Sequence, residues 1–410
     1  MDRLLLLIPT TSYRVSDFLE AADRLDVEVT VGSDQRQVLE KYSQGRTVTL
    51  DFRNLDRGTK QVVDFARRFT LRAIVATDEE TTVLAAKASK ALGLPHNSPA
   101  SVESATNKHR FRVALAEAGL PSPEFTLVSL DDNPAEAARR VDYPCVLKPL
   151  TLSASRGVIR ADDPAAFVAS FHRIAKILRT RGSESPAEVG QHLLVEAYIP
   201  GTEVALEGLL TRGRLNVLAL FDKPDPLEGP FFEETIYVTP SRLPEEIQGA
   251  VAAATARAVH ALGLHEGPIH AELRVNEDGP VIVEVAARSI GGLCSRVLRF
   301  GVGVRLEDLI LQHALGLPIE SLEREARPAG VMMIPIPRAG RLQHVHGLQR
   351  ARKVPGVEDV TITIPLGQRV NPLPEGNKYL GFIFARKESP EAVEATLRKA
   401  HSCLSFDIEP

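Results

Sequence analysis

The stretch from His270 to Gly292, HAELRVNEDGPVIVEVAARSIGG, constrains the fold of this chain more than any other. Two runs rich in Val, Ile and Leu flank the turn-forming residues Asn276–Pro280, which is typical of a β-hairpin. If those five residues form the loop, Val275 faces Val281 across the hairpin. Directly opposed residues point to the same face of a sheet, with Cβ atoms about 5 Å apart.

The same register places the carboxylates of Glu272 and Glu284 opposite each other. Two carboxylates in apolar surroundings repel each other, so we expect a cation between them. Carboxylates are hard oxygen ligands, and Mg²⁺ is typically held by one or two of them together with substrate phosphates. The hairpin therefore predicts a magnesium–nucleotide site. The alternative is a solvated acidic pair on an edge hairpin.

Composition limits the classes of partner. A net charge of −4 argues against a general polyanion binder, and 44% hydrophobic with 25% charged residues is an ordinary globular balance. Cys145, Cys294 and Cys403 are far apart and show no metal-binding spacing, which favours a reduced, cytoplasmic protein. No segment approaches eighteen uninterrupted apolar residues. We therefore expect small-molecule substrates, no nucleic acid and no membrane, and leave a homodimer open.

Residues 1–97 alternate between strand and helix patterns, which predicts a doubly wound, mostly parallel sheet. The turn after the first strand, Pro9–Ser12, has no glycine, so we assign no nicotinamide cofactor. GxxxxGK[ST] is also absent, which excludes a Walker-type phosphate loop. The expected strands are Leu4–Pro9, Val27–Gly32, Val48–Asp51 and Ala73–Thr77, and the expected helices are Val15–Leu25, Asp56–Phe69 and Glu79–Leu92.

The remaining chain predicts a linking helix and two further domains, so that the fold class is α/β plus α+β. One helix is expected from Ser98 to about Gly119, and Pro121 and Pro123 mark a boundary. Residues 123–325 form the second domain, with parts at about 123–195 and 196–325, and Arg179–Gly190 is expected to be a mobile loop. Residues 326–410 look like a small separate α+β unit.

A lysine and a hydroxyl-rich loop suit a phosphate. Lys148 ends a buried strand, and the loop Thr151–Val158, TLSASRGV, follows it. Hydroxyls, an arginine and backbone N–H groups can donate hydrogen bonds to a phosphate and balance its charge. The alternative is an ordinary surface loop. Lys108, taken alone, is typical of a solvated helix residue.

The strand Leu193–Gly201, LLVEAYIPG, ends in a Pro-Gly break. Backbone groups left free by that break can pair with an adenine edge, with Glu196 accepting from the exocyclic amine. Glu203 could then reach the ribose hydroxyls. Any edge strand with a glutamate would look alike, so this pattern is weak alone.

Taken together, these motifs resemble the ATP-grasp superfamily and, within it, the carboxylate–amine ligases related to L-amino acid ligases. The specific part of the resemblance is an ordered set that extends over nearly the whole chain. That set is Lys108, VLKPLTLSASRGV, VEAYIPGTEV, FFEET, HAEL and EVAARSIGG.

The resemblance implies an ATP-grasp fold and a role for each matching residue. It implies ATP with Mg²⁺, or Mn²⁺ in its place, as cofactors. The implied phosphate contacts are Lys108, Lys148, Ser153, Ser155 and Gly157; the adenine contacts are Glu196, Tyr198 and Ile199, and the ribose contact is Glu203. The implied metal ligands are Glu272 and Glu284, which also count as catalytic together with Arg288 at the reacting carboxyl or acyl phosphate. The implied substrate contacts are Glu233, Glu234, Thr235, His270, Arg288, Gly291 and Gly292.

Two positions depart from the superfamily pattern. Ala154 stands where many members carry a glycine, which predicts a stiffer phosphate loop. Ala286 stands where many carry an asparagine, which removes one metal ligand. A third feature is misleading: His265–His270 resembles a zinc metalloprotease helix, but the histidine spacing is wrong and Gly-Pro does not fit inside a helix.

The resemblance implies an ATP-dependent ligase that forms an amide through an acyl phosphate, joining two amino acids or an amino acid and a small acid. One alternative is a bicarbonate-activating carboxylase of the biotin or purine type. Another is a nucleotide-binding module without turnover.

Overall fold

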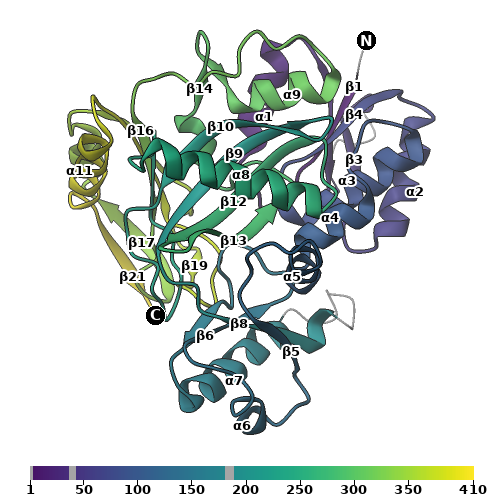
Figure 1. Cartoon of the computed structure of the whole chain (residues 1–410). Coiled ribbons are helices and arrows are strands. Elements are labelled where there is room, and N and C mark those ends of the chain that lie inside the picture. Colours follow the sequence, from purple (N-terminus) through teal and green to yellow (C-terminus); the bar gives the residue numbers. More distant parts are fainter. Residues whose placement is uncertain (1–2, 37–42, 181–188) are drawn as a thin grey trace.

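The computed structural model of the chain describes residues 3–36, 43–180 and 189–410 (Figure 1). The greater part of the loop expected at Arg179–Gly190 lies outside these residues. Within the described part of the chain, no helix has both the length and the apolar character needed to cross a membrane.

The N-terminal domain is the parallel sheet that the sequence predicts. Its strand order is β3-β2-β1-β4, and every pairing within it is parallel. The β1 residues are all buried because both faces of the sheet are covered, which explains the unbroken leucine run. The strands are β1 (Arg3–Leu7), β2 (Glu28–Ser33), β3 (Thr47–Thr49) and β4 (Leu71–Ala76), and the helices are α1 (Val15–Arg24), α2 (Leu55–Ala66) and α3 (Glu79–Leu92).

The prediction of a single helix from Ser98 to about Gly119 is wrong. The structure has two helices, α4 (Pro99–Thr106) and α5 (Lys108–Glu117), with Asn107 extended between them. The Asn107 side chain accepts from the backbone N–H groups of His109 and Arg110, which starts a new helix. This break places Lys108 at the first residue of α5.

Residues 125–197 form a small lobe that projects from the rest of the molecule (Figure 1). Its antiparallel sheet has the order β5-β8-β6-β7. The lobe has its own hydrophobic core, built around Phe167, Phe171 and Leu193. Its elements are β5 (Phe125–Ser129), α6 (Pro134–Ala137), β6 (Cys145–Pro149), β7 (Ile159–Ala161), α7 (Pro164–Thr180), η2 (Val189–Gln191) and β8 (His192–Ala197).

The central feature is an eight-stranded sheet with the order β13-β12-β9-β10-β11-β16-β20-β18. Helix α8 packs on β13, β10 and β9, and α9 packs on β12 and on β4 of the N-terminal sheet. The elements of this region are β9 (Thr202–Thr211), β10 (Arg214–Asp222), β11 (Ile236–Thr239), α8 (Glu245–Ala261), β12 (Gly267–Asn276), β13 (Gly279–Ala286), η3 (Cys294–Val297), β14 (Arg299–Phe300), β15 (Val304–Arg305) and α9 (Leu306–Leu315).

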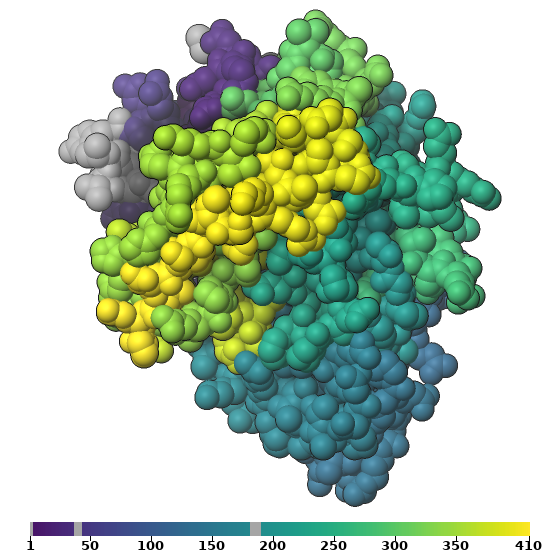
Figure 2. Space-filling model, turned by 90° about the vertical axis from the view of Figure 1, so that its left-hand side faces the viewer, coloured from purple at the N-terminus to yellow at the C-terminus, as the bar shows by residue number. Residues whose placement is uncertain are grey.

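The C-terminal residues are not fully separate from the second domain, because three of their strands belong to the central sheet. Strand β16 pairs with β11, so β16, β20 and β18 extend the central sheet. Figure 2 shows the C-terminal part (yellow-green to yellow) next to the small lobe (blue). The elements are β16 (Ala329–Ile334), β17 (Gly340–His346), α10 (Leu348–Arg352), β18 (Val357–Ile362), β19 (Arg369–Val370), β20 (Gly381–Arg386), α11 (Pro390–His401) and β21 (Ser405–Glu409), with β19, β17 and β21 in a three-stranded sheet.

Candidate active site

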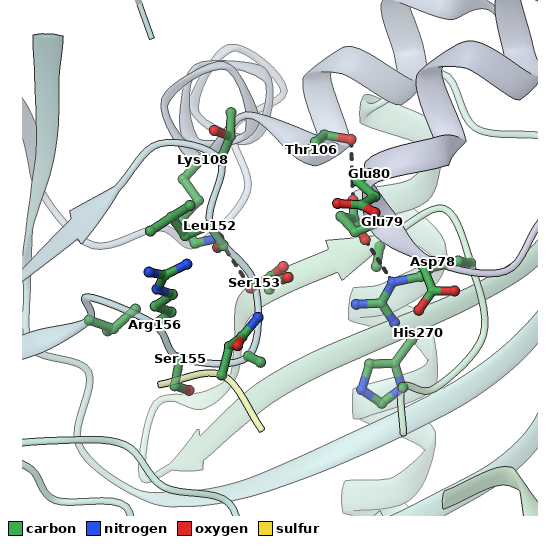
Figure 3. A pocket seen from close by; sticks show the side chains of 18 of the residues that line it. Asp78, Glu79, Glu80, Thr106, Lys108, Leu152, Ser153, Ser155, Arg156 and His270 are labelled. Atoms are coloured by element: carbon green, nitrogen blue, oxygen red, sulfur yellow. Dashed lines mark hydrogen bonds and ion pairs between the residues drawn. The ribbon is translucent and has the colours of Figure 1, made fainter. Parts of the chain in front are cut away.

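A cavity of about 1280 Å³ lies between the N-terminal sheet, the small lobe and the central hairpin. Figure 3 shows Ser153, Ser155 and Arg156 on one side of it and Asp78, Glu79 and Glu80 on the other, with His270 below Asp78 on that second side. Most of the residues implied by the resemblance line this cavity: Lys108, Lys148, Ser153, Ser155, Glu196, Tyr198, Ile199, Glu203, Glu234, His270, Glu272, Glu284, Arg288, Gly291 and Gly292.

Glu272 pairs with Glu284 across the hairpin of β12 and β13, as the sequence predicts. The expected five-residue loop is wrong, because Asn276 pairs with Gly279 and Val275 pairs with Pro280 rather than Val281. A register shift after Glu272 compensates for the shorter loop. The two residues are therefore directly opposed, although the loop that was used to align them is different.

A buried lysine that the sequence did not indicate lies beside Glu272. The Lys223 Nζ is 3.1 Å from Glu272 Oε1 and 2.7 Å from Glu203 Oε1, and it also donates to Glu234. Burial opposes the charge on Lys223, but the three carboxylates outweigh it and raise the pKa of the ammonium group. Lys223 thus already neutralises part of this acidic cluster.

Glu284 faces a different lysine. Lys108 Nζ is 3.6 Å from Glu284 Oε2 and donates to the carbonyl of Leu152 at 2.9 Å. Each hairpin carboxylate therefore has its own protein cation. The donor set still fits a hard divalent ion, because Glu203, Glu234 and Glu272 can offer oxygens that lie within 4.8 Å of one another, and Glu284 is opposite Glu272.

Lys148 is held by a buried ion-pair network. Its Nζ is 2.5 Å from Glu196 Oε2, and Arg112 Nε is 2.7 Å from Glu196 Oε1. Both Glu196 oxygens thus accept from cations, which does not suit the expected hydrogen bond to an adenine amine. Arg112 was missed because a helix arginine 84 residues away carries no local signal.

Arg274, also missed, orders the expected adenine and ribose segment. It donates from Nη1 to the Tyr198 hydroxyl at 2.8 Å and the Ile199 carbonyl at 3.1 Å, and from Nε to Glu203 Oε2 at 3.1 Å. Glu203 is therefore held between Arg274 and Lys223. This arrangement fixes the end of the small-lobe strand against the central sheet.

The phosphate loop, residues 151–158, has a strained backbone. Ala154 and Ser155 have φ values of +55° and +53°, a region that costs a residue with a Cβ about 1–2 kcal/mol. Gly157 has φ +71°, and a Cβ there would lie 2.7 Å from Pro149 Cγ. Gly157 does not line the cavity. It lets the loop turn back onto the strand that carries Lys148.

Arg288 lines the cavity and is tied to the N-terminal domain. Its Nε is 2.8 Å from Glu79 Oε2 on α3, and Glu79 also accepts from the Thr106 hydroxyl at 3.2 Å. Burial opposes the charge on Arg288, but Glu79 and Glu284 outweigh it and raise its pKa. The pair brings the N-terminal domain to the site, which the motifs did not predict.

His270 connects the hairpin to a fully buried glutamate. Its Nδ1 is 3.1 Å from Glu207 Oε2, and its Nε2 is 3.5 Å from Glu272 Oε1. Burial opposes protonation, but the two carboxylates outweigh it and raise the pKa of His270 to about 9. Glu207 also accepts from the backbone N–H of Ile290, so it orders the segment before Gly291.

Two of the expected substrate residues do not line the cavity. Glu233 and Thr235 are absent from its wall, and Thr235 donates instead to Asp225. Glu234, between them, faces the cavity because alternate residues of an extended chain point in opposite directions.

Three family models match the chain in order. An ATP-grasp N-terminal domain matches residues 19–96, an ATP-grasp domain residues 141–297, and the L-amino acid ligase C-terminal domain 2 residues 332–409. The crystal structure of an L-amino acid ligase from Bacillus licheniformis is 27% identical, with a TM-score of 0.83 over 100% of this chain and 99% of that one.

Curated relatives match at similar or lower identity. The uncharacterized protein y4rH of Sinorhizobium fredii is 24% identical over 100% of this chain and 84% of its own length. Alanine–anticapsin ligase of Bacillus subtilis is 27% identical over 62% of this chain and 56% of its own length. The match thus spans little more than half of that ligase. From the ordered models and the full-length structural match, the chain belongs to the ATP-grasp superfamily of ligases and carries an L-amino acid ligase C-terminal domain.

Proposed function

We propose that the protein is an ATP- and Mg²⁺-dependent ligase that joins a carboxylate to an amine, either two amino acids or an amino acid and a small acid. The observation that carries the proposal is the convergence, in one cavity, of a carboxylate pair, two lysines and an arginine. These are Glu272, Glu284, Lys108, Lys148 and Arg288. The name of the alanine–anticapsin ligase supports amino-acid substrates.

In the proposed reaction a carboxylate oxygen of the substrate attacks the γ-phosphorus of ATP, and ADP leaves. The amine then attacks the carbonyl carbon of the acyl phosphate, and inorganic phosphate leaves with the bridging oxygen. No nucleophilic side chain is needed. The protein contributes orientation and charge neutralisation, which are the main terms in phosphoryl transfer.

The proposal gives several of the cavity residues a task. Lys148 and Lys108 would neutralise the phosphates, and the loop of Ser153 and Ser155 would donate to them. Glu272 and Glu284 would hold Mg²⁺, which supplies charge stabilisation at the phosphoryl group. Arg288, oriented by Glu79, would contact the developing acyl phosphate.

Labelled oxygen tests the proposal. With ¹⁸O-labelled carboxylate substrate, ATP, Mg²⁺ and amine, inorganic phosphate should carry one label per turnover, because one carboxylate oxygen leaves with it. A panel of amino acids, singly and in pairs, would first identify the substrates by ADP release. Label that enters phosphate only from bicarbonate would favour the carboxylase alternative. Amide formed together with AMP would indicate an adenylate and contradict both.

A further inference from the structure

A segment of the C-terminal domain reaches across to the small lobe. We call residues 372–379 the strap. The carbonyl of Pro374 accepts from the backbone N–H of Gly157 at 3.0 Å. Glu375 accepts from Arg173 on α7 through both oxygens, with Nε to Oε1 at 2.7 Å and Nη2 to Oε2 at 3.0 Å. The strap therefore binds the phosphate loop and the helix of the same lobe.

The strap also forms part of the cavity wall. Asn377, Lys378 and Tyr379 line the cavity beside the phosphate loop. Thus Pro374 and Glu375, which contact the lobe, are closely followed in the chain by residues that would face a bound ligand. A displacement of the strap would change both its grip on the lobe and the shape of the site.

The shape of the strap is fixed independently of the lobe. The Gly376 N–H donates to the Pro372 carbonyl at 2.8 Å, and a Cβ on Gly376 would lie 1.9 Å from the Asn371 carbonyl oxygen. After the strap, the Leu380 N–H donates to the Ile334 carbonyl in the central sheet at 2.9 Å. The strap is therefore a tight turn attached to the body of the molecule.

The small lobe, by contrast, is built as a separate body. Its hydrophobic core consists of residues between Val128 and Val195, with Phe231 as an added neighbour from outside. Its links to the strap are polar. A lobe with its own core and polar contacts to its neighbours is expected to move relative to them.

We infer that the strap is a latch for the small lobe, in which Arg173 and Glu375 are positioning residues that hold the phosphate loop over the nucleotide. The bidentate geometry favours one orientation of the lobe. Arg173 also lies over the Phe231 ring, 4.9 Å from its centroid, which fixes the guanidinium from the other side. Nucleotide should leave only when the latch opens.

The expected contribution of the Arg173–Glu375 ion pair follows from the solvent exposure of its two side chains. The side chains of Arg173 and Glu375 are 43% and 42% exposed, so the pair should shift the open–closed equilibrium by up to about fivefold. Like charges placed opposite each other should shift it in the other direction. Dissociation of a bound nucleotide is the step that reports this equilibrium.

The test uses a charge swap in the full chain. Glu375→Arg and Arg173→Glu each place like charges opposite each other, and the double variant restores opposite charges. The readout is the rate at which a fluorescent N-methylanthraniloyl-ATP, bound with Mg²⁺, is displaced by excess ATP. Each single variant should release it about fivefold faster, and the double variant should return to within about twofold of the wild type.

Two further variants separate the latch from general effects. Arg140→Glu changes an exposed arginine of the same lobe whose ion pair in the described part of the chain, with Glu136, stays within the lobe, and it should leave release unchanged. Gly376→Ala disturbs the strap turn without changing a charge and should also speed release. Single variants that match the wild type, or a double variant as fast as the singles, would overturn the inference. The inference rests on the ATP binding proposed above. Because the readout needs no amide product, a failure of the ligase chemistry can be distinguished from a failure of the latch.

Discussion

Removal of the charge on Glu196 tests the network that holds Lys148 in the site. Glu196 is 3% exposed and lies between Arg112 and Lys148, which donate to its two oxygens at 2.7 and 2.5 Å. Glu196→Gln keeps the volume of the side chain but leaves both buried cations without a counter-charge. We expect the small lobe to lose stability and Lys148 to lose its orientation.

The magnitude follows from the pKa of Glu196. Burial opposes ionisation, but the charges of Arg112 and Lys148 outweigh it and lower the pKa from 4.5 to about 2. This shift corresponds to about 3 kcal/mol, close to the ~3–5 kcal/mol expected when one partner of a buried pair is removed. Because the pKa is lower in the folded state, this stabilisation is complete above about pH 4.5 and is lost as the pH falls toward 2.

Urea unfolding followed by circular dichroism measures the effect. At pH 7 the first transition of Glu196→Gln should lose about 3 kcal/mol relative to the wild type, with the difference constant down to about pH 5 and smaller below it. The matched control is Glu103→Gln, which removes a partly exposed partner of the exposed Arg110 and should cost no more than about 1 kcal/mol. A loss for Glu196→Gln no larger than for the control would refute the reasoning.

The other predictions concern turnover. Glu284→Gln should abolish ADP release. Its unfolding midpoint should stay within error of the wild type, because the Glu284 side chain is 31% exposed and its ion pair with Lys108 is long, at 3.6 Å. Normal activity of Glu284→Gln would contradict a role of this residue as a metal ligand. Lys148→Ala should raise the Kd for ATP, because its contact exists before reaction, whereas Arg288→Ala should mainly lower kcat. A change in ATP affinity alone for Arg288→Ala would place that residue in the nucleotide site.

The sequence predicted the elements that carry a local signal. The parallel N-terminal sheet, the hairpin and the opposition of Glu272 and Glu284 follow from periodicity and turn residues. The loop length was wrong, because Glu277 and Asp278 alone form the turn and a register shift adjusts the rest. Glu272 still faces Glu284, because the shorter loop and the register shift each move the pairing by one residue, in opposite directions.

The missed features are contacts between distant parts of the chain. Arg112 meets Glu196, and Glu79 meets Arg288, on elements that pack together only in the folded chain. No periodicity relates such partners. In the same way, β16 has the pattern of an ordinary buried strand, and nothing in the sequence indicates that it pairs with β11 as well as with β20 of its own region.

Lys223 bears on the prediction that a cation lies beside the hairpin carboxylates. The acidic cluster does contain a cation, which is a protein side chain: Lys223 forms ion pairs with Glu203, Glu234 and Glu272. Lys223→Met would remove the cation that the three carboxylates share, leaving Arg274 beside Glu203 and His270 beside Glu272, and should cost about 3–5 kcal/mol. Because their oxygens can surround one ion, millimolar Mg²⁺ should raise the melting temperature of Lys223→Met more than that of the wild type. Equal rises in melting temperature would mean that Mg²⁺ does not bind at the carboxylates that Lys223 neutralises.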